Sequence, residues 1–328
     1  MVVAHNVAVL KLRILSPTNL TDDVVQVLEN EPCVSGLVLI KGAAIRPIGD
    51  VIVADLPREA VNDVIDQLRA LGVHRDGTIE IEHVDTWLSA DGFKAELIAP
   101  GSSADAVVWA DVAQRSYEES ELNWTYLSFM SLATMIAAIA IVLDSQILVI
   151  GAMVLGPEFG AVAALGVALV RRRYALFGHA IRTLFLGFTA AIGITTAFAL
   201  LGRAVGLITL ADITGARPAT DFIYSPDKWS FIVAVIAGAA GVLSLTSARS
   251  GGLAGVFISV TTVPAAGNIA LGIAFGAGDE IWPSALQLLL NISGMALAGW
   301  AALALQQFVW TRVSIRRAKA MNHPRRML

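Results

Sequence analysis

Charged residues are scarce in this sequence, and the shortage is concentrated in one part of it. Only 15% of the residues are charged, whereas a soluble domain usually carries about 25%. Residues 1–122 are rich in Asp, Glu, Lys and Arg, but residues 123–310 contain few of them. The mean hydropathy of the whole chain is +0.69. This distribution excludes a wholly soluble protein and predicts a water-soluble domain followed by a membrane domain.

Cysteine is almost absent. Cys33 is the one cysteine of the chain, which excludes an internal disulfide bond. Its neighbours are modestly apolar, so we predict a half-buried structural thiol. Residues 1–10 lack a basic segment followed by a long apolar core, so no signal peptide is predicted and the N-terminal domain is expected to stay in the cytoplasm.

The motifs of several functional classes are also missing. The N-terminal part has no CxxC pair, no phosphate-binding glycine loop and no aromatic RNA-binding signature, and its His74 and His83 are isolated. The apolar part has no HExxH motif and no serine elbow. We therefore predict no catalytic residue, no metal site, no cofactor and no nucleic-acid partner, and expect that the chain is not an enzyme.

Residues 1–88 show the pattern of a small α+β domain. Leu10, Leu12 and Ile14 share one face of an alternating run, which is typical of a half-buried strand. Helical spacing of apolar residues follows twice, and the predicted order is strand-helix-strand-strand-helix-strand, the ferredoxin-like βαββαβ pattern. The predicted strands cover 7–15, 36–45, 50–55 and 78–87, and the helices cover 21–30 and about 58–71. Such domains have many functions, and we expect a regulatory or assembly module here.

Residues 89–124 are predicted to be a linker. Its second half, 105–121, has the apolar and charged faces of an amphipathic helix. The helix either lies at the membrane surface or is an ordinary solvated linker helix, and the pattern favours neither.

Residues 125–310 contain six apolar stretches long enough to cross a bilayer. Strongly basic loops follow the second, fourth and sixth stretches, and the sixth leads into a basic tail at 311–328. Because basic loops stay in the cytoplasm, both termini are predicted to be cytoplasmic in a multi-pass protein of the cell membrane. The predicted spans are 126–143, 147–170, 176–205, 229–245, 253–275 and 284–309.

Similar motifs interrupt the second and fifth spans. Gly and Pro break helices, and in lipid the freed backbone groups must face protein or water. Two halves of three spans, 125–205 and 229–310, would be inverted repeats, an architecture typical of transporters and some channels. The alternative is that these residues are tolerated kinks in packed helices. The predicted pathway residues are Gly151, Gly156, Pro157, Glu158, Gly160, Thr261, Thr262, Pro264, Gly267 and Asn268.

Glu158 adds a carboxylate to the first break. A charged group is costly at bilayer depth and normally faces a cavity or a partner. Glu158 could bind a cation, carry a coupling proton or pair with a base. If the break is shallow, the side chain instead meets bulk water.

The same residues carry a resemblance to a known family. The run Ile150-Gly151-Ala152-Met153 with Gly156-Pro157 and Gly160, the later Val263-Pro264 with Gly267, and the N-terminal domain resemble the domain of unknown function 389 family of hydrophobic membrane proteins. The resemblance covers most of the chain. The family pattern has an apolar residue in place of Glu158 and a proline in place of Ala161, and it implies no activity.

These patterns lead to a functional expectation. The inverted repeats, the paired breaks and the buried carboxylate favour a transporter or channel for a small solute or ion. The N-terminal domain would regulate or assemble it. The alternative is a membrane-anchored sensor or scaffold, since abundant Gly and Ala also suit tight helix packing. The expected partners are the lipid bilayer, the unidentified solute or ion and further copies of the chain.

Overall fold

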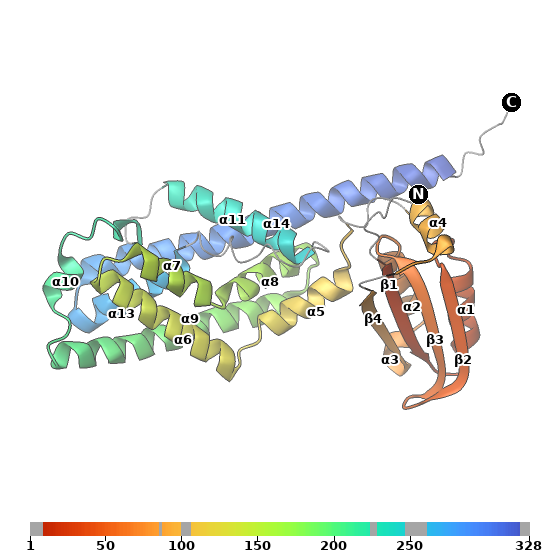
Figure 1. Ribbon diagram of the computed structural model, residues 1–328, viewed down its shortest axis with the longest axis horizontal. Coiled ribbons are helices and arrows are strands. Elements are labelled where there is room, and N and C mark those ends of the chain that lie inside the picture. Colours follow the sequence, from red (N-terminus) through yellow and green to blue (C-terminus); the bar gives the residue numbers. More distant parts are fainter. Residues whose placement is uncertain (1–8, 85–86, 100–105, 224–227, 247–260, 322–328) are drawn as a thin grey trace. The chain divides into compact units, whose positions relative to one another are not determined.

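A computed structural model describes residues 9–84, 87–99, 106–223, 228–246 and 261–321 (Figure 1). The chain divides into two compact units. One contains Met1–Val112 with Thr246–Arg249 and Gln307–Leu328, and the other contains Ala113–Leu245 with Ser250–Gln306.

The first unit is built on a four-stranded antiparallel sheet, with the strands in the order β2-β3-β1-β4. Two main helices and a short third helix connect the strands, so the predicted βαββαβ order is confirmed, apart from the short helix. The elements are β1 Val9–Ser16, α1 Thr21–Glu29, β2 Gly36–Ile45, β3 Ile48–Pro57, α2 Val61–Ala70, α3 Val73–Asp76 and β4 Thr78–Val84.

The core of this unit follows the predicted alternation. Leu10, Leu12 and Ile14 of the central strand β1 are buried, as predicted, because every second side chain of a strand points to the same face. They pack with apolar residues of α1 and α2, among them Leu28 and Leu68. The sheet and these two helices therefore enclose one hydrophobic core.

The predicted linker contains two helices, α4 Ala90–Ile98 and α5 Trp109–Glu119. Ala99 and Val108 belong to the core of the sheet unit. Asn62 holds the chain just before and at the start of α5, because its amide donates to the Val107 carbonyl at 2.6 Å and accepts from the Trp109 N–H at 3.1 Å. This part of the linker is thus fixed to the domain.

Cys33 is buried in the same core, with 4% of its surface exposed. Burial raises the pKa of the thiol to about 12, and the neighbouring Glu31 adds to the effect. Because the thiolate is the reactive form, we expect maleimide to label Cys33 in denaturant and not in the folded chain at neutral pH. An Asp76→Cys variant, changed at an exposed position of this unit, is the control and should label in the folded state. Rapid labelling of folded parent protein would contradict the prediction.

The second unit is helical, and its long apolar helices indicate a membrane protein. Among the described residues, four helices are long and apolar enough to cross a bilayer: α6 Trp124–Val142, α9 Tyr174–Ala204, α11 Lys228–Thr246 and the part Gly278–Val309 of α14, which runs Gly278–Met321. A fifth candidate is the pair α7 Gln146–Leu155 and α8 Glu158–Val170, bent by 56°. The short α10 Leu210–Thr214 and the 3-10 turn Asp221–Ile223 lie between α9 and α11.

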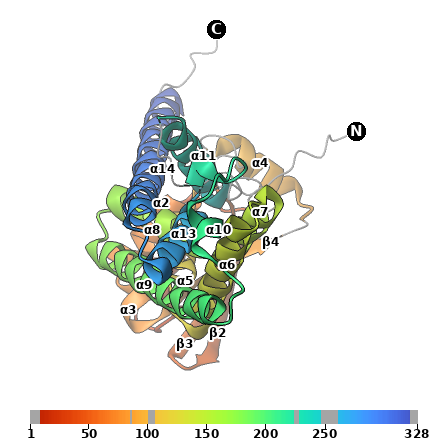
Figure 2. The same ribbon diagram turned by 90° about the vertical axis from the view of Figure 1, so that its left-hand side faces the viewer.

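The described helix at the fifth predicted span is shorter than the sequence predicts. Its described part is α13 Thr262–Phe275, which has 14 residues and is shorter than a span, while residues 253–260 lie outside the described part of the chain. Pro264 does not interrupt this helix. It is the third residue of α13, in the first turn, where a proline removes no helical hydrogen bond. α13 lies between α6, α9 and α14 (Figure 2).

Small residues allow several helices of this unit to approach closely. A Cβ on Gly238 of α11 would lie 2.5 Å from the backbone of Met295 in α14. A Cβ on Gly299 of α14 would lie 2.7 Å from the Val242 side chain of α11. Such contacts between small residues are typical of helices that pack within membranes.

Candidate functional site

The centre of the site is the break between α7 and α8. α7 ends at Leu155, Gly156 follows in an extended conformation, and Pro157 precedes the first residue of α8, Glu158. Proline has no N–H to continue the hydrogen bonds of α7, which explains why the helix stops here. The carboxylate of Glu158 therefore lies at a helix N-terminus, where the helix dipole favours a negative charge. Glu158 is buried, with 7% of its surface exposed.

The two predicted motifs meet at this carboxylate. Thr262, the first residue of α13, donates its hydroxyl to Glu158 Oε1 at 2.5 Å, across 104 positions of the sequence. A Cβ on Gly156 would lie 2.3 Å from Glu158 Oε2 and 2.7 Å from the Val263 side chain, so a larger residue there would have to displace the Glu158 carboxylate. The N-termini of α8 and α13 thus converge on one acidic side chain.

α14 contributes two amides to the same place. Gln287 Nε2 and Asn291 Nδ2 both donate to the hydroxyl oxygen of Thr261, at 3.0 and 3.1 Å. Thr261 directly precedes α13. Both amide side chains are almost completely buried, each with 1% exposed surface.

A second polar cluster lies further along α13. Asn268 Nδ2 donates to Ser284 Oγ and to Glu280 Oε2, both at 2.9 Å. Arg217, from the segment between α9 and α11, donates to Glu280 Oε2 at 2.8 Å and to Asn268 Oδ1 at 3.3 Å. The Arg217–Glu280 ion pair is buried, with side-chain exposures of 4% and 13%.

The two clusters are joined along one face of α14. Glu280, Ser284, Gln287 and Asn291, which we call the polar stripe, follow one another at intervals of four, three and four residues. This spacing puts all four on the same side of a helix. Glu280 and Ser284 contact Asn268 of α13. Gln287 and Asn291 contact Thr261, which precedes α13. A buried polar row is costly within an apolar helical unit, and in membrane proteins such residues mark functional sites.

The segment that carries Arg217 is also held from the other side. Asp144, in the turn between α6 and α7, accepts hydrogen bonds from the Thr220 hydroxyl at 2.9 Å and from the Ala219 N–H at 3.3 Å. Residues 217–220 are therefore fastened both to α13 and α14 and to the α6–α7 turn.

A comparison with protein families finds a match that covers this region. Residues 153–297 match the family described as "Domain of unknown function (DUF389)". The resemblance predicted from the glycine and proline motifs is thereby confirmed over residues 153–297, whereas the N-terminal domain and residues 150–152, which were predicted to share it, lie outside the match. The DUF389 match includes the break, α13 and the whole polar stripe.

One uncharacterized relative is also detected. An uncharacterized protein of Methanocaldococcus jannaschii, MJ0678, is 25% identical over 211 residues, which is 61% of this chain and 59% of the relative. The match thus spans about three-fifths of the relative's length. No solved structure matches the chain.

The predicted pathway residues divide into two groups. Gly156, Pro157, Glu158, Thr261 and Thr262 come together at the break, with Pro264 in the adjoining first turn of α13, and Asn268 joins the second cluster. The other three lie elsewhere. Gly151 is exposed within α7, Gly160 packs against Glu119, and Gly267 packs against α6 at Thr134, Ala137 and Ala138.

Five residues of the candidate site were missed by the sequence prediction: Arg217, Glu280, Ser284, Gln287 and Asn291. The spacing of the polar stripe within an apolar helix was a signal that could have found four of them. Arg217 has no comparable signal, because it lies in a mixed-charge connection far from its partners in the sequence.

Three buried oxygens at the break lack a hydrogen-bond partner among the described residues: Glu158 Oε2, Gln287 Oε1 and Asn291 Oδ1. Buried polar atoms are normally paired, so three unpaired acceptors in side chains that bind the adjacent Thr261 and Thr262 need a physical explanation. In the described part of the chain, no group of three or more His, Cys, Asp or Glu side chains could hold a metal ion.

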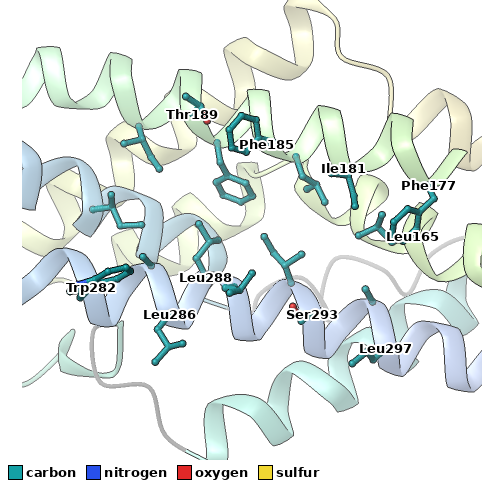
Figure 3. A pocket seen from close by; sticks show the side chains of 18 of the residues that line it. Leu165, Phe177, Ile181, Phe185, Thr189, Trp282, Leu286, Leu288, Ser293 and Leu297 are labelled. Atoms are coloured by element: carbon teal, nitrogen blue, oxygen red, sulfur yellow. The ribbon is translucent and has the colours of Figure 1, made fainter. Parts of the chain in front are cut away.

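A large cavity of about 1290 Å³ lies beside the polar stripe, between α8, α9, α13 and α14. Figure 3 shows side chains of α9, such as Phe185 and Ile181, and of α14, such as Leu286 and Leu288, around it. Its lining is apolar apart from the hydroxyls of Thr189 and Ser293 and the indole of Trp282. The cavity therefore offers apolar contact, whereas the chemistry resides in the polar stripe and the break.

Proposed function

We propose that this protein is a membrane transporter or channel for a small solute or ion, with the N-terminal domain as a regulatory or assembly module. The polar stripe carries the proposal, because it joins the Glu158 cluster to the Arg217–Glu280 cluster inside an apolar helical unit. From Glu280 to Asn291 the stripe extends for about 16 Å at 1.5 Å per residue. This is roughly half of the ~30 Å hydrocarbon core of a bilayer.

The proposal includes a topology. Six spans would form two inverted three-helix repeats, 125–205 and 229–310, in the cell membrane with both termini in the cytoplasm. The bent pair α7–α8 supports a broken helix in the first repeat. The hydrogen bond between Glu158 and Thr262 supports a shared site for the two motifs. The basic loops support the orientation. Homo-oligomers are also expected, since most oligomeric proteins assemble from identical chains.

A sensor or scaffold without transport is the second candidate. The close glycine contacts between α11 and α14 favour it, because tight packing alone is enough for an anchor. Its weakness is the polar stripe, since an anchor has no need for a row of buried polar side chains with unpaired oxygens.

Flux into proteoliposomes separates the two candidates. We expect the intact protein to move at least one member of a panel of common ions and small solutes. Glu158→Gln and Asn291→Leu should lower that flux by about tenfold or more, a change of at least ~1.4 kcal/mol. Asp279→Asn, changed at an exposed position of α14, is the matched control and should retain the flux. Folded protein that moves nothing across the panel would favour the sensor or scaffold.

A further inference from the structure

We infer that Glu158, Gln287 and Asn291 form a binding site for a monovalent metal cation. The inference rests on the proposed function, since it names the class of ion that the pathway would hold. It begins with the three unpaired oxygens at the break, one from a carboxylate and two from amides. Each lies in a side chain that is at least nine-tenths buried.

The hydrogen bonds of two adjacent threonines link the three side chains that carry these oxygens. Glu158 is bound to Thr262, and Gln287 and Asn291 are both bound to Thr261, the adjacent residue. Because each amide uses its nitrogen on Thr261, its oxygen is left to accept from something else. Carboxylate, amide and hydroxyl oxygens are the ligands that hard metal cations prefer.

The negative charge of the Glu158 carboxylate also favours a cation at this site. No Lys, Arg or His side chain in the described ranges forms an ion pair with Glu158, and Arg217 pairs with Glu280 at the other end of the stripe. The N-termini of α8 and α13 favour the ionised carboxylate. An ionised carboxylate within a membrane unit needs a compensating charge.

The balance of charge selects a monovalent cation. One carboxylate offsets one positive charge, whereas a divalent ion would leave an excess charge beside two positive helix ends. A proton on Glu158 would neutralise the carboxylate, but it could donate to only one oxygen and would leave the two amide oxygens unpaired. An anion would be repelled by the carboxylate itself.

Equilibrium binding to purified full-length protein in lipid nanodiscs tests the inference without requiring transport. The probes are ²²Na⁺ and ⁸⁶Rb⁺, the latter standing for K⁺, in a choline chloride buffer of constant ionic strength. We expect saturable binding of at least one probe, displaced by the same unlabelled ion. Glu158→Gln keeps the size and the acceptor for Thr262. It should weaken binding by at least about tenfold, since even an indirect partner of a metal ligand contributes about 10–100-fold.

Two further variants make the result specific. Asn291→Leu removes one amide oxygen and should also weaken binding, whereas Asp279→Asn should bind as the parent does. Elution as a single folded species on size-exclusion chromatography is required of each variant. No saturable binding of either probe, or unchanged binding by Glu158→Gln, would overturn the inference. A solute flux that persists without cation binding would leave the proposed function standing, and binding without any flux would leave the site standing.

Discussion

Replacing Arg217 with alanine should destabilise the helical unit by about 3–5 kcal/mol, the cost of leaving one partner of a buried ion pair alone. Glu280 would remain as a buried carboxylate, and Asn268 would lose a hydrogen-bond donor. The segment 217–220 would keep its hydrogen bonds to Asp144 but lose those that Arg217 makes to α13 and α14. We therefore expect a lower unfolding temperature in nanodiscs and faster cleavage by proteinase K between α9 and α11.

Two controls separate the ion pair from a general loss of charge. Arg203→Ala removes an exposed arginine that donates to the Ala274 carbonyl and lies over the Phe275 ring, and it should cost less, about 1–2 kcal/mol. The double variant Arg217→Met with Glu280→Met removes both buried charges. It should recover much of the stability, because apolar replacements of buried pairs are often neutral or stabilising. An Arg217→Ala protein that melts and resists protease like the parent would show that this pair does not hold the segment.

Gly238→Leu should prevent α11 from packing on α14. Even the first added carbon would lie 2.5 Å from the backbone of Met295, and a backbone cannot move aside as a flexible side chain can. Overpacking of this kind costs about 1–3 kcal/mol for a few added methylenes and more where nothing can shift. We expect loss of the monodisperse peak in fluorescence-detected size-exclusion chromatography.

Gly193→Leu is the matched control for this variant. Gly193 lies within α9, is exposed, and has no atom within 4 Å of an added Cβ. Because glycine is the poorer helix former, the leucine there should be tolerated or slightly stabilising. Equal loss of folded protein in both variants would mean that any large side chain disturbs this unit, and the close contact would not be the cause.

The sequence predicted the sheet unit better than the helical one. In β1 the alternation of Leu10, Leu12 and Ile14 predicts the buried face directly, since a strand has a period of two. In the apolar helices nearly every residue is hydrophobic, so periodicity does not tell which face is buried. The long helices could be predicted from composition, but the helices against which each one packs could not.

The same limit applies to the candidate site. The break at Pro157 could be predicted from the chemistry of proline, and the carboxylate beside it from the sequence. The partner of that carboxylate could not, because Thr262 is 104 positions away and threonine is common in apolar helices. Arg217 lies in a connection of mixed charge, where nothing in the local sequence distinguishes it. Its role depends on a tertiary contact that no local pattern encodes.

The burial of Cys33 has a practical consequence for mapping the break. Its protected thiol makes the natural sequence its own cysteine-free background for chemical labelling of the folded protein. Single cysteines at Thr261, Gln287 and Asn291 can be introduced without any other change to the chain. Membrane-impermeant thiol reagents applied to one side of the bilayer and then the other would report from which side water reaches each position.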